Sequence, residues 1–166
     1  SSNLLGSEDL WYREPDAGFA RRLTALPEGE WTPVPRPMSP GLVYVEGSDP
    51  LSGRLVLIPD TAAVPLGRLY LTPSALMAGE PDWNAMGDQL CFTVRQPDGS
   101  SQIWRLSMSD TLAVQLTVGL SATPPTGPQI DRGPRWSPDG TAILMASNRG
   151  KLWGVWALSP LGEAQG

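Results

Sequence analysis

The amino-acid sequence predicts an all-β protein: a β-propeller of four-stranded blades, with about three and a half blades present as an incomplete ring. Two observations predict this fold class. Eighteen Gly and eighteen Pro among 166 residues disfavour long helices and favour short strands joined by turns. A unit with Trp and Gly at fixed offsets also recurs about every 45 to 53 residues, a period typical of a propeller blade.

The repeat is clearest in a seven-residue segment that ends in glycine. Its best-preserved copy, residues 134–140, reads Pro-Arg-Trp-Ser-Pro-Asp-Gly. A second copy at 81–87 lies 53 residues earlier, and a third at 35–41 lies 46 residues before that. A Leu-Thr pair marks the same period at Thr24, Thr72 and Thr117. Because both markers agree, we expect one structural unit every 45 to 50 residues.

The last unit shows the expected order of strands within a blade. Its Ser-Pro-Asp-Gly segment, residues 137–140, predicts a type I turn, because Pro presets the second backbone angle and Gly accepts positive φ. This turn joins an inner strand ending at Trp136 to a second strand over 141–147. A third strand is expected to begin at Leu152 and to end at Ser159. Since both of its faces are apolar, we expect it to lie between two layers.

The two preceding units follow the same order with weaker motifs. In the middle unit, strands are expected over residues 89–94, 102–108 and 113–118. In the first unit, strands are expected over residues 41–45, 53–58 and 67–72. The tryptophans Trp11, Trp104 and Trp153 recur at one place in each unit, which indicates core anchors between neighbouring sheets rather than a stacking platform.

The two ends of the chain define the expected domain organisation. Residues 9–14 and 19–26 predict two outer strands of an earlier blade; a helix over 17–26 is the alternative, because Phe19, Leu23 and Leu26 have helical spacing. Trp11 precedes Thr24 by 13 residues, as Trp104 precedes Thr117, which favours strands. We therefore expect one propeller segment, 1–166, divided into the outer half of a blade at 1–30, blades at 31–72 and 79–118, and a blade at 132–166 that lacks its last strand.

Composition and charge exclude several classes of function. A net charge of -5 with twelve basic residues and no basic run argues against a nucleic-acid partner. The sequence has no His, so the usual nucleophile and proton-shuttle systems are missing and no catalytic residue is expected. No cofactor or metal site is expected: Asp98 and Asp139 precede Gly as turn residues, without the Asp-x-Asp pattern of a calcium loop. No apolar run is long enough for membrane insertion, and Cys91 is expected to be a buried thiol.

The final motif allows a family resemblance to be stated. Residues 136–140, Trp-Ser-Pro-Asp-Gly, with Ser147-Asn148-Arg149-Gly150 and Leu152-Trp153, resemble the WSPDG-type repeat of the TolB-like β-propellers. The copy at 81–87 keeps Trp83 and Gly87 only. The resemblance implies a propeller of four-stranded blades that often serves as a binding platform. It also implies a periplasmic or extracellular location, although the given chain contains no targeting signal.

Propeller geometry selects the candidate binding residues. Loops from second to third strands and from one blade to the next open on one face, opposite the Ser-Pro-Asp-Gly turns. The loops selected are 46–52, 95–101 and 148–151, with the connection 119–133. Their charged residues Arg95, Asp98, Arg149 and Lys151 are the candidate binding residues. Solvated loop charges are the alternative interpretation.

The sequence favours a non-catalytic binding or assembly module for a protein or peptide partner. One alternative is the propeller portion of a larger, prolyl-oligopeptidase-like hydrolase whose catalytic residues are not in this chain. Another is a purely structural fragment that another chain completes. The apolar strand from Leu152 to Ser159 is expected to pair either with the amino-terminal strands, closing a ring of about four blades, or with another chain.

Overall fold

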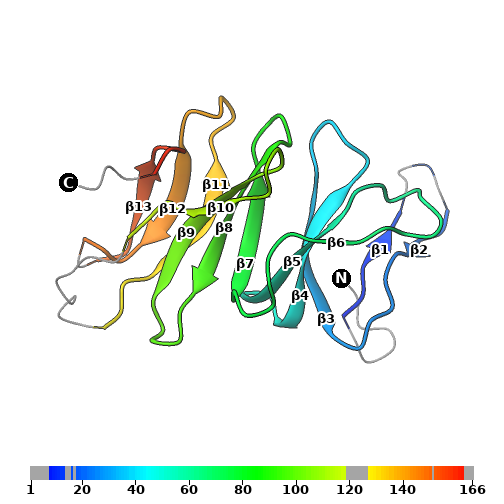
Figure 1. Cartoon of the computed structure of the whole chain (residues 1–166), viewed down its shortest axis with the longest axis horizontal. Coiled ribbons are helices and arrows are strands. Elements are labelled where there is room, and N and C mark those ends of the chain that lie inside the picture. The colour runs from blue at the N-terminus through cyan, green and yellow to red at the C-terminus, as the bar shows by residue number, and fades with distance from the viewer. Residues whose placement is uncertain (1–7, 14–15, 17, 119–126, 151, 163–166) are drawn as a thin grey trace.

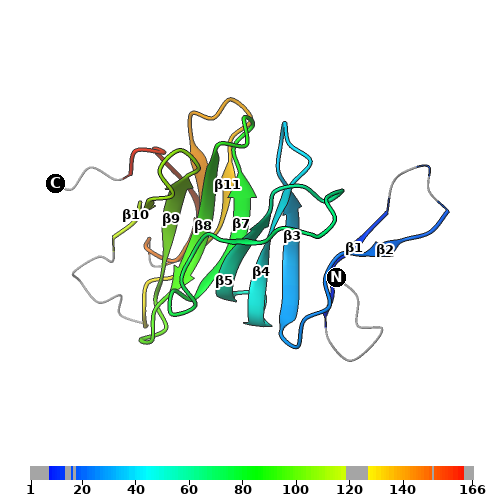
Figure 2. The same cartoon turned by 45° about the vertical axis from the view of Figure 1, so that its right-hand side comes forward.

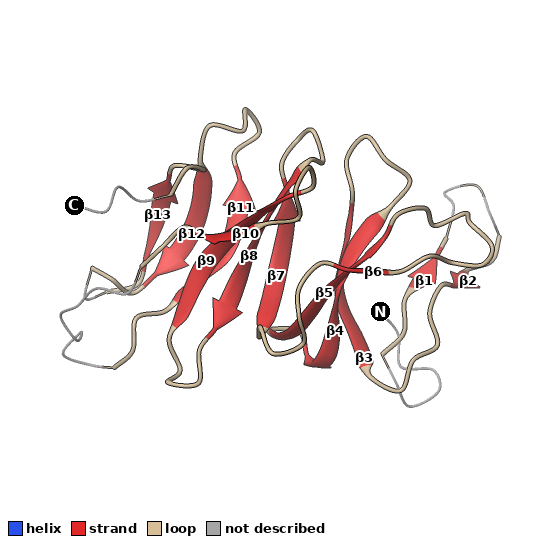
Figure 3. Cartoon of the chain, in the orientation of Figure 1, coloured by secondary structure: helices blue, strands red, loops and turns tan. Residues whose placement is uncertain are grey.

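The computed structural model describes residues 8–13, 16, 18–118, 127–150 and 152–162, and these residues form thirteen strands and no helix (Figure 3). Two short strands come first, β1 (Trp11–Tyr12) and β2 (Arg21–Arg22). The first blade contains β3 (Gly29–Pro35), β4 (Leu42–Asp49), β5 (Ser52–Ile58) and β6 (Leu69–Tyr70). The second contains β7 (Ala78–Trp83), β8 (Gln89–Arg95), β9 (Ser101–Ser107) and β10 (Ala113–Gln115). The third contains β11 (Asp131–Trp136), β12 (Ile143–Ser147) and β13 (Gly154–Leu158).

Each blade is an antiparallel meander whose first strand is innermost. β7 packs beside both β3 and β11, so the inner strands of the three blades follow one another. The sheets of the first two blades touch through one residue pair, Gly53 and Ala78. The sheets stand in a row, with the β1–β2 pair at one end and β13 at the other (Figure 1). The described residues therefore form an open part of a propeller, as the sequence predicts.

Alternating apolar residues place one core layer between each pair of neighbouring sheets. On β4, Val43 and Val45 face a cluster shared with Leu90 and Phe92 of the second blade. The opposite face of β4 carries Tyr44, which packs in a separate cluster with Leu10 and Val56. Because successive side chains of a strand point to opposite faces, a strand between two layers is apolar throughout.

Between the second and third blades lies another core cluster. Its members are Cys91, Ile103, Leu116, Ile143, Met145 and Leu158. The Cys91 side chain is fully buried, as expected, and burial raises the pKa of its thiol well above the ordinary value. The cysteine thus behaves as a small apolar residue in the layer that joins the two blades.

A bulge interrupts the inner strand of every described blade at the same position. Thr32, Glu80 and Gly133 have positive φ angles of 47°, 52° and 60°, and each lies at a register shift in the pairing of its strand. Each residue lies three positions before the end of its inner strand. A bulge bends a strand and re-aims the neighbouring side chains. Positive φ is strained for Thr and Glu but accessible to Gly.

The Leu-Thr repeat has a structural explanation. The hydroxyl of each threonine accepts a hydrogen bond from a backbone N–H that lies within, or directly before, the third strand of its own blade. The pairs are Thr24 with Leu10 at 3.0 Å, Thr72 with Leu55 at 2.8 Å and Thr117 with Ile103 at 3.0 Å. All three threonines are buried. The Leu-Thr pair therefore marks the end of the outer strand, where a threonine hydroxyl, instead of a backbone carbonyl, accepts the next hydrogen bond from the third strand.

The amino-terminal residues form strands rather than a helix. Trp11 and Tyr12 of β1 pair with Arg22 and Arg21 of β2. The helical alternative over 17–26 is therefore wrong for residues 18–26, which the structure describes. Leu10 and Leu23 pack on the first blade, while the β1–β2 pair projects from the end of the row (Figure 2). Thr24 explains this outcome, because its hydroxyl caps Leu10 only when the two segments run side by side.

The surroundings of strand β13 differ from those that the sequence predicts. It was expected to lie between two layers, but Val155 is 79 % exposed and Trp156 is 40 % exposed. Among the described strands β13 pairs with β12 alone, and β1 and β2 lie at the far end of the row (Figure 1). The predicted pairing with the amino-terminal strands is therefore not formed. No second layer from the described residues covers the outer face, although its apolar pattern matches that of a covered strand.

The prediction that Trp11, Trp104 and Trp153 are core anchors between neighbouring sheets is confirmed for Trp104 alone. Trp104 packs against the core between the first two blades. Trp11 is 36 % exposed and Trp153 is 54 % exposed, so neither is buried between two described sheets. Both lie at the ends of the row of blades, where a neighbouring sheet is present on one side at most.

Candidate functional site

The connections between second and third strands lie along one edge of the molecule. In Figure 1 the β4–β5, β8–β9 and β12–β13 connections are at the lower edge, and the β3–β4, β7–β8 and β11–β12 turns are at the upper edge. The turn at Asp139 has the expected form, with Gly140 at a φ of 71° and the Asp139 carboxylate accepting a hydrogen bond of 2.6 Å from Ser137. Asp98 and Arg149, which belong to the β8–β9 and β12–β13 connections, are therefore on this lower edge.

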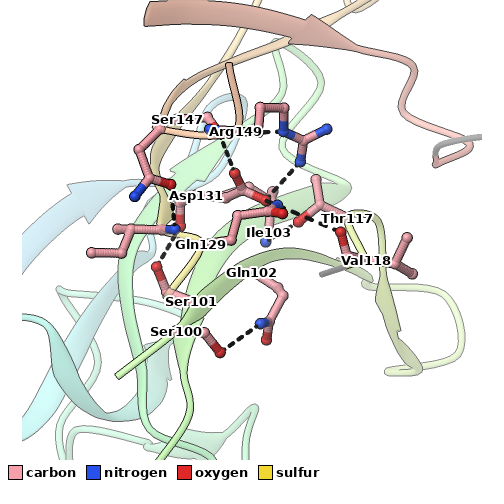
Figure 4. Close-up of polar contacts among 12 residues, drawn as sticks. Ser100, Ser101, Gln102, Ile103, Thr117, Val118, Gln129, Asp131, Ser147 and Arg149 are labelled. Atoms are coloured by element: carbon pink, nitrogen blue, oxygen red, sulfur yellow. Dashed lines mark hydrogen bonds and ion pairs between the residues drawn. The ribbon is translucent and has the colours of Figure 1, made fainter. Parts of the chain in front are cut away.

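Arg149 belongs to a buried ion pair rather than to a solvated loop (Figure 4). Its Nη2 donates to Oδ2 of Asp131 at 2.7 Å, and its side chain is only 10 % exposed. The Asp131 carboxylate is fully buried and also accepts hydrogen bonds from Ser147 at 2.5 Å and from Gln129 at 2.9 Å. Four polar side chains therefore converge where β11 begins, and Arg149 compensates the charge that Asp131 buries.

The residues around this ion pair join the third blade to the second. Ser101 at the start of β9 donates to the backbone carbonyl of Asp131 at 2.8 Å. Asn148 accepts a hydrogen bond from the backbone N–H of Ile130 at 2.8 Å and donates to the carbonyl of Pro128 at 3.1 Å. The Ser-Asn-Arg segment at 147–149 therefore fastens the chain that enters β11. Its place in the repeat has a structural reason that requires no ligand.

Asp98 shapes the loop between β8 and β9. Its carboxylate accepts a hydrogen bond of 2.9 Å from the backbone N–H of Ser100, and Gly99 follows at a φ of 84°. Hydrogen bonding to Ser100 lowers the pKa of the exposed Asp98 carboxyl. Asp98 is thus a turn residue, and the hydrogen bonds of its side chain are with Ser100.

Arg95 lines a cleft between the second and third blades. The cleft has a volume of about 100 Å³ and is lined by Leu51, Glu80, Thr93, Arg95, Gly99, Ser101, Ile130 and Arg132. Glu80 lies at the strained bulge of β7. Its Oε2 accepts hydrogen bonds of 2.8 Å from the Thr93 hydroxyl and from the backbone N–H of Gly133. The two blades therefore share one carboxylate inside this cleft.

A larger hollow lies beside the β4–β5 connection. It has a volume of about 650 Å³, and polar residues such as Glu28, Ser48, Ser52 and Arg54 line it. The nearby Glu46 carboxylate is buried and forms ion pairs with Arg54 and Arg68. The Arg54 guanidinium also lies 4.0 Å from the centre of the Tyr70 ring. The charges of Glu46, Arg54 and Arg68 beside this hollow are therefore paired with one another.

The structure brings the sequence-predicted residues to neighbouring loops but gives them different roles. Arg95 and Asp98 lie in the β8–β9 region, Arg149 lies in the β12–β13 connection, and Lys151 lies outside the described residues. Sequence reasoning missed Asp131, Glu80 and Arg132. One signal existed for Asp131: it precedes Trp136 by five residues, as Glu30 precedes Pro35, the corresponding end of β3.

Within the described ranges, no group of three or more His, Cys, Asp or Glu side chains is placed to hold a metal ion. The same residues contain no helix that could span a membrane.

Comparison with known proteins gives no match at the level of sequence. No family model matches this chain, and no curated protein matches it. Solved structures, however, share its fold. TolB from Acinetobacter baumannii superposes with a TM-score of 0.67 and 17 % identity, over 92 % of this chain and 35 % of the TolB chain.

Two other solved structures, a hydrolase and a protein complex, also share this fold. A puromycin hydrolase mutant complexed with PGG gives a TM-score of 0.69 and 20 % identity, over 93 % of this chain and 26 % of that one. The nidogen/laminin complex gives a TM-score of 0.61 and 12 % identity, over 86 % of this chain and 49 % of that one. This chain therefore spans half or less of each of these three chains. At such identities the likeness shows the fold, and the chain has the fold of a TolB-like β-propeller.

Proposed function

We propose that this chain is a non-catalytic propeller module that binds a protein partner by accepting a strand of that partner along β13. The observation that carries the proposal is the exposure of β13. The third strand of the first blade, β5, buries Leu55, Val56 and Leu57, whereas β13 exposes Val155 and Trp156. An edge strand with apolar side chains and open backbone groups is a template for strand addition.

The repeat indicates what the added strand contains. In each preceding repeat, a threonine hydroxyl accepts a hydrogen bond from the N–H of a residue within, or directly before, the third strand. Leu152 occupies that position in the last repeat, because it precedes Trp153 as Ile103 precedes Trp104. We therefore propose that the partner strand carries a Leu-Thr pair, with its threonine placed to cap Leu152. The proposed blades are those defined above: 31–72, 79–118 and 132–166, preceded by the outer half of a blade at 1–30.

The non-catalytic character is supported by the roles of the polar groups. The sequence contains no His. The buried carboxylates Asp131 and Glu46 are paired with arginines, and Asp98 holds a turn. A carboxylate that is already compensated by a guanidinium is a poor general acid or base near neutral pH. We place the module in the periplasm or outside the cell by its likeness to TolB.

A second candidate is the propeller portion of a larger hydrolase. The likeness to the puromycin hydrolase favours it, since this chain covers 26 % of that protein. Under this alternative, the chain contributes binding surface and the reacting groups lie elsewhere. The two candidates differ in the partner that completes β13, and neither predicts hydrolysis by the chain alone.

Strand addition is tested with a peptide taken from the chain itself. A peptide with the sequence of residues 112–118 contains the Leu-Thr pair of the second blade. Added to the protein, it should slow amide hydrogen exchange in β13. A control peptide with Val in place of the residue corresponding to Thr117 should protect β13 less, because it lacks the capping hydroxyl.

A protein variant provides the second arm of this test. Val155→Lys places a charge on the exposed face of β13 and should abolish the protection, because an added strand would bury the ammonium group. Leu69→Lys is the matched control, since Leu69 is a 53 % exposed residue of the short outer strand β6. Unchanged exchange in β13 with the first peptide, in a protein whose other strands remain protected, would refute the proposed function.

A further inference from the structure

The cleft between the second and third blades contains two arginines without a charged partner. Arg95 is exposed at the end of β8, and Arg132 is exposed on β11. Among the described residues neither guanidinium forms an ion pair, whereas Arg22, Arg54, Arg68 and Arg149 each do. The lining of the cleft therefore carries two guanidinium groups against the one carboxylate of Glu80, on a protein whose net charge is -5.

Arg132 is also held in place. Its guanidinium lies 5.3 Å from the centre of the Trp153 ring, a cation–π arrangement. An arginine that is stacked on an indole loses less side-chain entropy when it binds a ligand than a free one does. The guanidinium keeps its N–H donors in this arrangement, because stacking uses the ring face and leaves the edges available.

The carboxylate of Glu80 also lines the cleft. It is fixed by the Thr93 hydroxyl and the Gly133 N–H, both at 2.8 Å. The backbone of Glu80 has a φ of 52°, whereas the corresponding residue of the third blade is Gly133. The same bulge occurs at Thr32 in the first blade, so this backbone geometry belongs to the repeat, and in the second blade it places the Glu80 carboxylate in the cleft.

These features define the chemistry of the ligand. Two guanidinium groups match a carboxylate, which accepts paired N–H donors. A volume of about 100 Å³ admits one such group with little more than the atoms next to it. Glu80 adds a negative charge that opposes a second charge on the ligand, so a monoanion is favoured over a phosphate dianion.

We propose that this cleft binds a single carboxylate group through Arg95 and Arg132, and that Glu80 restricts the ligand to one negative charge. The carboxylate belongs either to the end of a polypeptide or to a small free acid. No residue of β13 lines the cleft, so the carboxylate site extends the proposed function without depending on it. Its polar residues come from the second and third blades and Leu51 comes from the first, which explains why no single repeat unit shows the cleft.

The test uses three probes and amide NMR shifts of Gly99, Ser101 and Gly133. The probes are an N-acetylated Gly-Gly-Ala peptide with a free carboxyl end, the same peptide with a carboxamide end, and sodium acetate. We expect saturable shifts with the free-acid peptide and none with the carboxamide. If acetate saturates the site as tightly as the peptide, the ligand is a small acid; if the peptide binds more tightly, the ligand is a polypeptide end.

Variants test the assigned roles. Arg95→Gln and Arg132→Gln should each weaken binding of the free-acid peptide about tenfold or more, since each removes a charge-assisted contact. Arg105→Gln removes the same charge from β9, outside the cleft, and should leave the affinity within about twofold. Glu80→Gln should raise the affinity for inorganic phosphate relative to acetate.

Three results would overturn the proposal. One is equal binding of the acid and carboxamide peptides, and another is an affinity that Arg95→Gln and Arg132→Gln both leave unchanged. The third is the absence of any shift at millimolar peptide in a protein with a dispersed amide spectrum. Failure here with intact strand addition at β13 would leave the proposed function standing, and the converse result would leave the carboxylate site standing.

Discussion

The backbone N–H of Trp136 donates a hydrogen bond of 2.8 Å to the carboxylate of Asp82, a residue 54 positions earlier in the sequence. The bond joins the inner strands β11 and β7. Burial raises the pKa of Asp82, and the hydrogen bond from Trp136 opposes that rise. The tryptophan of the best-preserved repeat therefore contributes its backbone, as well as its ring, to the contact between two blades.

Replacing Asp82 should loosen this contact. Asp82→Ala leaves the Trp136 N–H without its acceptor and should lower the free energy of unfolding by about 1 to 3 kcal/mol. Asp82→Asn keeps an oxygen acceptor without the buried charge and should lower it less. Urea unfolding followed by tryptophan fluorescence measures both values. Equal stabilities of the alanine and asparagine variants would contradict this role for the hydrogen bond.

Glu30 should make stability depend on pH. Its side chain is fully buried, and burial raises the pKa of its carboxyl above the ordinary value of 4.5. The folded protein therefore binds a proton more readily than the unfolded chain, and stability falls as the pH rises through the raised pKa. Glu30→Gln should be more stable than the natural protein at pH 7, and this difference should shrink as the pH falls toward 4.5.

Thermal unfolding from pH 4 to pH 8 checks this prediction for Glu30. Glu28→Gln is the matched control, because Glu28 is exposed two residues earlier. The control should alter the pH dependence little. A Glu30→Gln protein that follows the pH dependence of the natural protein would show that burial does not shift this carboxyl.

Removing Arg149 should be costly, because it leaves the buried Asp131 carboxylate without its counter-ion. Arg149→Gln is expected to lower the free energy of unfolding by about 3 to 5 kcal/mol, the usual cost of breaking a buried pair. Asp131→Asn combined with Arg149→Gln should recover much of this loss. Chemical unfolding of the two single variants and the double variant measures the coupling. Additive losses would mean that the two side chains act independently.

The capping threonine should contribute to the stability of its blade. Thr117→Val preserves shape and removes the oxygen that accepts the Ile103 N–H, so a loss of about 1 to 2 kcal/mol is expected. Thr141→Val is a control at an exposed turn. Hydrogen exchange should quicken at the Ile103 amide in the first variant only. Unchanged exchange there would show that the Leu-Thr repeat has another cause.

The sequence determined the elements and their order. Turn chemistry at 137–140 and alternating apolar residues at 89–94 act between near neighbours, so their consequences can be derived without the fold. The Leu-Thr spacing also carried real structural information, because Thr117 contacts Ile103 within one blade. Even the choice of strand over helix near Leu23 followed from that spacing.

The tertiary structure decided which residues form sites and which faces are covered. Arg149 was predicted to be a candidate ligand contact. It lies beside Asp131 because the β12–β13 connection packs against the start of β11. The cleft of Arg95 and Arg132 depends on how neighbouring blades pack, and the exposure of β13 depends on the absence of a second described layer on its outer face. Contacts between blades join residues about one repeat apart, and period-two patterns cannot specify them because they reveal only which side chains share a face. The physical reason is that a repeat encodes its own blade, whereas a site requires the relative placement of two.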